Sequence, residues 1–175
     1  MTIMRKLIPL SMAAALLLPG GDASAAPAQL LNKTVTTSAT FSVNAVADDG
    51  TNSTMPRTVQ RTIYVSSKGR IFMRVSRSAG RGSDTRERSP EETGQNMRFQ
   101  GSKLVGVLKF PSGAAQMVVD FDAGFSSCTV NFLFGREGGQ AIRFKGLNGK
   151  MYTQQGSFSV SGQSCSIREG NPFAE

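Results

Sequence analysis

The sequence predicts an all-β protein built as an antiparallel meander of about eight to ten short strands. Three observations predict this class. Apolar residues recur at every second position, turn sequences rich in Gly, Asn and Asp separate these stretches, and helical spacing is absent after the first 25 residues. Successive tight turns favour the pairing of consecutive strands, so we expect a small barrel, with a β-sandwich as the alternative.

A signal peptide over residues 1–25 is expected to precede the domain. Arg5 and Lys6 supply the positive start, residues 7–18 the apolar stretch, and small residues lead up to Ala25. A membrane-spanning helix needs ~20 apolar residues, so this stretch is too short and we expect cleavage rather than an anchor. The mature domain, residues 26–175, is then periplasmic or secreted, and we expect a monomer.

The first strand is expected over residues 35–45, where apolar or small side chains alternate with Thr, Ser and Asn. A hairpin follows, from Val59 to Val75, and Gly69 is placed to take the positive φ of its turn. One face of the first hairpin strand is apolar except for Arg61, which interrupts it.

The segment 79–95 breaks the alternation. It is polar, rich in both charges and contains Pro90, and it predicts a long mobile loop.

The rest of the chain returns to alternation, with turns at sequences such as Gly101-Ser102 and Asn148-Gly149. Strands are expected over 97–99, 104–110, 115–121, 128–134, 142–144 and 152–167.

The two cysteines, Cys128 and Cys165, predict one disulfide. Neither lies in a C-x-x-C motif, which a redox-active pair would favour. Both fall in alternating segments, so the bond should tie the last strand to an interior one and protect the closing edge of the sheet.

The chain has a net charge of +8. Without Arg5, Lys6 and Asp22, which precede the predicted cleavage site, 18 basic and 11 acidic side chains remain, a net charge of +7. Such a charge suits contact with an anionic envelope component, although solubility alone also explains it. Nothing beyond the charge points to specific nucleic-acid binding.

Histidine is absent, which excludes Ser-His-Asp and Cys-His catalytic groups and the commonest zinc ligand sets. We therefore expect no catalytic residues, metal or cofactor. Asp120 and Asp122 are the best carboxylate pair, and a hydrolase that uses them is the alternative. An ordinary strand end leading into a turn is the favoured explanation, because Asp and Gly are common turn residues.

The candidate ligand-binding residues are Arg70, Phe72, Arg74 and Arg77. Arginines interleaved with an aromatic ring can bind phosphate or carboxylate groups. Acidic residues in the following segment can instead neutralise these arginines as part of a solvated surface. The inner-face phenylalanines could line a cavity for a small apolar ligand or simply fill the core.

Four segments of the mature chain carry a resemblance: residues 63–72, 104–107, 164–167 and 170–173. In these segments and in their order the chain resembles small exported proteins, without an assigned function, of rhizobia and related alphaproteobacteria. The resemblance implies export and transfers no site residues. Taken together, the sequence predicts a non-catalytic exported binding or envelope-interaction module, and a purely structural envelope protein is a further alternative.

Overall fold

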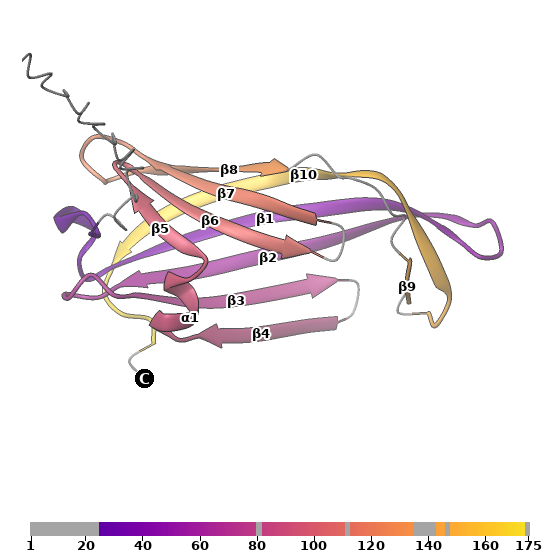
Figure 1. Cartoon of the computed structure of the whole chain (residues 1–175), viewed down its shortest axis with the longest axis horizontal. Coiled ribbons are helices and arrows are strands. Elements are labelled where there is room, and N and C mark those ends of the chain that lie inside the picture. Colours follow the sequence, from indigo (N-terminus) through magenta and orange to yellow (C-terminus); the bar gives the residue numbers. More distant parts are fainter. Residues whose placement is uncertain (1–24, 80–81, 111–112, 135–142, 146–147, 174–175) are drawn as a thin grey trace, which may run out of the picture.

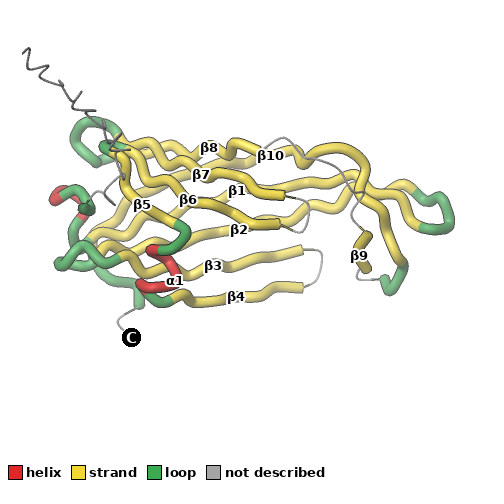
Figure 2. The backbone as a smooth tube through the Cα atoms, in the orientation of Figure 1, coloured by secondary structure: helices red, strands yellow, loops and turns green. Residues whose placement is uncertain are grey.

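The computed structural model describes residues 25–79, 82–110, 113–134, 143–145 and 148–173. The predicted signal peptide, apart from Ala25, lies outside the described residues. Two antiparallel sheets with ten strands make up the domain (Figures 1 and 2), which confirms the all-β prediction.

The large sheet has the strand order β4-β3-β2-β1-β10-β9. Its strands are β1 (Lys33–Ala47), β2 (Asn52–Val65), β3 (Ile71–Ala79), β4 (Gly82–Arg88), β9 (Arg143–Lys145) and β10 (Met151–Glu169). The small sheet has the order β5-β6-β7-β8. Its strands are β5 (Met97–Gln100), β6 (Lys103–Phe110), β7 (Gly113–Phe121) and β8 (Cys128–Phe134). A 3-10 turn, η1 (Ala28–Leu30), precedes β1, and one helix, α1 (Pro90–Gly94), links β4 to β5.

The sheets form a sandwich, so the favoured expectation of a barrel is wrong and the alternative describes the fold. Every strand of a barrel has two neighbours, whereas β4 and β9 are edges of the large sheet and β5 and β8 are edges of the small one. The local meanders β1–β3 and β5–β8 form as predicted. They do not join because α1 carries the chain to the second layer and β10 returns to pair with β1.

The core lies between the sheets, and the alternation of β1 faces it. Val35, Ala39 and Phe41 are buried, as the spacing predicts. The small sheet contributes the buried residues Met97, Phe99, Leu104, Met117, Val119, Phe121 and Val130. At the hairpin turn Gly69 has φ +72°, which confirms its predicted role, and its N–H donates to the carbonyl of Ser66 at 2.9 Å.

The segment 79–95 contains β4 and α1 in place of the predicted unstructured loop. β4 is charged because it pairs across the sheet with arginines of β3: Arg74 contacts Glu87, and Arg77 contacts Asp84. Helix α1 begins with a capping box, in which Ser89 and Glu92 bond each other's backbone N–H groups.

The disulfide between Cys128 and Cys165 is confirmed, with Cα atoms 5.5 Å apart. Its expected position is reversed. β8 is an edge strand and β10 an inner one, so the bond joins the two sheets instead of closing a single edge.

Candidate functional site

Five arginines line the inner surface of β2, β3 and β4, the surface that faces the small sheet. We call this set the arginine face: Arg57, Arg61, Arg77, Arg86 and Arg88. Alternate residues of a strand point to the same side of the sheet. The arginines of β2 and β3 alternate with residues that are buried in the core, namely Val59, Ile63, Met73 and Val75, so they lie on the inner surface. Register brings them together: Val75 lies between Arg61 and Arg86, and Met73 lies opposite Arg88.

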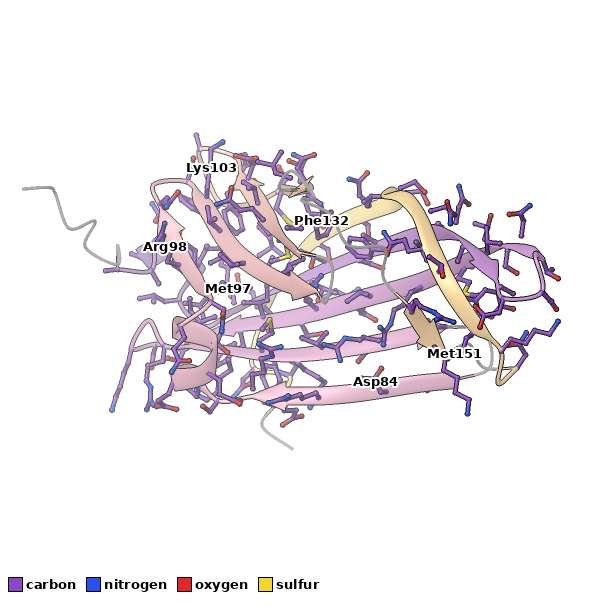
Figure 3. All side chains as sticks on the ribbon, turned by 45° about the vertical axis from the view of Figure 1, so that its right-hand side comes forward. Asp84, Met97, Arg98, Lys103, Phe132 and Met151 are labelled. Atoms are coloured by element: carbon purple, nitrogen blue, oxygen red, sulfur yellow. A yellow bond between two sulfur atoms is a disulfide. The ribbon has the colours of Figure 1, made fainter. Side chains whose placement is uncertain are left out.

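Arg61 is the innermost member, and the residue is only 7% exposed. It lies opposite Thr37 of β1, and its guanidinium carbon is 6.0 Å from the centre of the Phe132 ring of β8 (Phe132 is labelled in Figure 3). Its Nη1 has no hydrogen-bond partner among the described residues. Burial, followed by the charges of Arg77 and Arg88, lowers the pKa of Arg61 to about 10, so it remains a cation at neutral pH.

Positive charge exceeds negative charge on the arginine face. Asp84 contacts Arg77 at 3.0 Å and Arg57 at 3.5 Å, and Glu92 contacts Arg86 at 3.0 Å. Arg61 and Arg88 have no carboxylate within ion-pair distance in the part of the chain that the structure describes. Arg88 Nε, like Arg61 Nη1, is buried without a hydrogen-bond partner there.

One side of the arginine face is open to solvent. Residues Gly82 to Glu87 of β4 are all exposed, so neither surface of this edge strand is covered. In Figures 1 and 3 β3 and β4 extend beyond the small sheet, and Asp84 marks β4 in Figure 3. The side chains of Arg57, Arg77 and Arg86 are therefore accessible from solvent on this side.

The four residues predicted from the sequence do not form one site. Arg77 belongs to the arginine face, whereas Phe72 and Arg74 lie on the opposite surface of β3. There the Arg74 guanidinium is 4.9 Å from the centre of the Phe173 ring and 2.6 Å from Glu87, and Phe72 stacks between Tyr64 and Phe173. Arg70 pairs with Glu91 of α1 at 2.6 Å. Each of these three residues thus has a partner within the chain.

Sequence reasoning missed Arg57, Arg61, Arg86 and Arg88 as site residues. The available signal was the interruption of an apolar strand face by Arg61. A long cation at a core position is uncommon and marks either a paired charge or a site.

A hollow of about 420 Å³ lies where the chain enters the sandwich. Its lining includes Ala26, Gly69, Met97 and Phe99 together with the Arg70–Glu91 pair. The volume is within the range that small ligands occupy.

The two candidate catalytic carboxylates serve different local contacts. Asp120 pairs with Lys103 across β6 and β7 at 2.7 Å. Asp122 closes the turn after β7: it accepts hydrogen bonds from Ser126 Oγ at 2.6 Å and from the Ser126 N–H at 2.7 Å. These bonds lower the pKa of Asp122 to about 2, with the Ser126 hydroxyl as the largest cause.

Replacing Ser126 by alanine should raise the pKa of Asp122 from about 2 towards its usual 3.8. Because the pKa is lower in the fold than in the unfolded chain, ionised Asp122 stabilises the fold above about pH 4 and this contribution is lost as the pH falls through 2. The variant should lose less stability over that interval. An NMR titration of the carboxyl carbon measures the pKa. Ser127→Ala is the control, and an equal shift there would contradict the assignment to Ser126.

No metal-binding cluster of three or more Cys, Asp or Glu side chains occurs within the described ranges. Nor does any described helix have the length and apolar character needed to cross a membrane. Comparison with known proteins gives no match to a family model, a curated protein or a solved structure.

Proposed function

We propose that this protein is a non-catalytic, exported binding module that takes an anion at the arginine face. The predicted signal peptide, residues 1–25, supports export to the periplasm or beyond. The observation that carries the proposal is Arg61, a cation that is 7% exposed and has an unpartnered Nη1 beside two further arginines.

A buried charge without a counter-charge destabilises a fold by several kcal/mol. The Phe132 ring offsets part of this cost, because a desolvated cation–π contact contributes about 2 kcal/mol. An oxyanion would offset more, since a guanidinium donates two parallel hydrogen bonds to carboxylate, phosphate or sulfate groups. The net positive charge of the chain would also steer anions towards it.

Sodium sulfate should raise the melting temperature of the wild-type protein more than that of Arg61→Met, at equal ionic strength. A ligand at one hundred times its dissociation constant stabilises the folded state by about 2.7 kcal/mol. Sulfate also stabilises proteins by exclusion from their surface, and the variant retains that general effect. Differential scanning calorimetry gives both melting temperatures.

Arg168→Met is the matched control, because Arg168 is an exposed arginine of β10 and its loss removes the same charge. Arg74→Met tests the opposite surface of β3. Both variants should keep the wild-type response to sulfate. Equal losses in all three variants would reduce the effect to net charge and refute a site at Arg61.

A further inference from the structure

From the charges and donors that remain unpaired on the arginine face, we infer that its ligand is a doubly charged oxyanion, such as a phosphate monoester, held between Arg61 and Arg88. The inference rests on the proposed function and specifies its ligand.

The first step is the count of charge. The carboxylates of the arginine face are used by other members: Asp84 by Arg57 and Arg77, and Glu92 by Arg86. Five arginines against two carboxylates leave the arginine face with a net charge of +3, and Arg61 and Arg88 are its two members without a carboxylate partner among the described residues. A dianion neutralises both, whereas a monoanion leaves one.

The second step is the set of donors. Three buried side-chain polar atoms of the described residues have no hydrogen-bond partner: Thr37 Oγ1, Arg61 Nη1 and Arg88 Nε. All three side chains project from the inner surface of the large sheet, from β1, β2 and β4, and Thr37 is directly opposite Arg61. The two guanidiniums are donors that the terminal oxygens of a single phosphate or sulfate group can satisfy together.

The third step is the set of charged side chains around the pair. The charged side chains facing the pair are Arg57 on β2, Arg77 on β3, Asp84 and Arg86 on β4 and Glu92 on α1, and the buried side chains of the small sheet opposite are apolar. The chain has no histidine. A change of affinity between pH 5 and pH 8 therefore reports the ionisation of the ligand.

The test is calorimetric titration of the processed protein with methyl phosphate, sulfate and acetate at pH 5.0 and pH 8.0 and low ionic strength. A phosphate monoester loses its second proton near pH 6, so methyl phosphate should bind about tenfold more tightly at pH 8.0. Sulfate is a dianion throughout and should bind equally at both values. Acetate should bind at least tenfold more weakly than sulfate.

Arg88→Gln and Arg61→Met should each weaken sulfate binding at least tenfold, and Arg168→Met should leave it unchanged. The glutamine variant keeps a polar side chain at position 88, so loss of binding there does not depend on replacing a buried cation by an apolar group.

The outcomes separate the two proposals. If acetate binds as tightly as sulfate and the binding of methyl phosphate does not depend on pH, the inference of a doubly charged ligand is wrong. The proposal that the protein binds an anion would then still hold. No binding of any of the three would overturn both. A tenfold pH effect for sulfate would show that the protein titrates, and would overturn the dianion.

Vesicles distinguish the source of the phosphate group. Binding to vesicles that contain phosphatidic acid, a phosphomonoester, but not to phosphatidylglycerol vesicles would support the inference with a lipid as the carrier. Binding of methyl phosphate without vesicle binding would support it with a soluble ester.

Discussion

Replacing both Cys128 and Cys165 by serine should lower the free energy of unfolding by about 2–4 kcal/mol. The bond links residues 37 apart in sequence, and removing it restores conformational freedom to the unfolded chain. The native fold should persist under mild conditions, because the core between the sheets does not depend on the sulfur atoms alone. Urea denaturation followed by circular dichroism measures the loss.

The loss of stability in the serine variant should be concentrated in strand β8. The disulfide ties edge strand β8 to β10, so amide hydrogens of β8 should exchange faster in the variant, whereas those of β2 should change little. Both cysteines are half-buried against the core, and the alanine pair controls for burial of the serine hydroxyls. Wild-type protein treated with a reductant should match the alanine pair. An unchanged melting temperature after reduction would contradict the prediction.

Replacing Arg61 by methionine should raise the free energy of unfolding by about 1–4 kcal/mol when no anion is present. Methionine is flexible and unbranched, and its sulfur can keep the contact with the Phe132 ring. The pKa of Arg61 is lower in the fold than in the unfolded chain, so the charged form opposes folding fully below about pH 10. The penalty is relieved only as the pH rises from there towards the usual pKa of an arginine.

Arg61→Lys is the control, because it keeps a cation at the buried position and should give no such gain. Urea denaturation in a buffer of low ionic strength without multivalent anions measures both variants. If the methionine variant is less stable than the wild type, Arg61 stabilises the fold without a ligand. That result would contradict the proposal that Arg61 is a destabilising cation whose role is to bind an anion.

Local structure could be predicted well from the sequence. The alternation of β1 identifies its buried face, and the position of Gly69 identifies a positive-φ turn, because both depend on residues close together in the chain. The disulfide could be predicted because only two cysteines are present.

The stacking of the sheets could not be predicted in this way. It depends on β10 pairing with β1, a contact between the two ends of the domain that no local pattern encodes. The structure of residues 82–94 was missed for a related reason. The charges of β4 indicate a loop when they are considered alone and a strand only when the arginines of β3 lie beside them, although Ser89 and Glu92 carry a visible helix-capping signal.

The candidate site was predicted in part. The sequence singled out arginines near the hairpin as candidate anion ligands, which stays a prediction, and one of them, Arg77, lies on the arginine face. The division of the arginines between two surfaces follows from alternation in β3 and could have been predicted. The aromatic rings that contact these arginines could not have been predicted, because Phe173 reaches Arg74 from the C-terminus and Phe132 reaches Arg61 from the other sheet.

The place of β10 beside β1 sets the order in which the domain can be completed. β1 is among the first strands to be synthesised, and its pairing with β2 is local, but its other edge pairs with the last strand, as far as Lys33 with Glu169. Until residues 151–169 arrive, that edge presents unpaired N–H and C=O groups, and such edges are templates for association with other chains. The disulfide must wait for the same strand, because Cys165 lies within it. Completion of the domain is thus a late, long-range event, and a nascent chain is most vulnerable to aggregation just before its final strand is available.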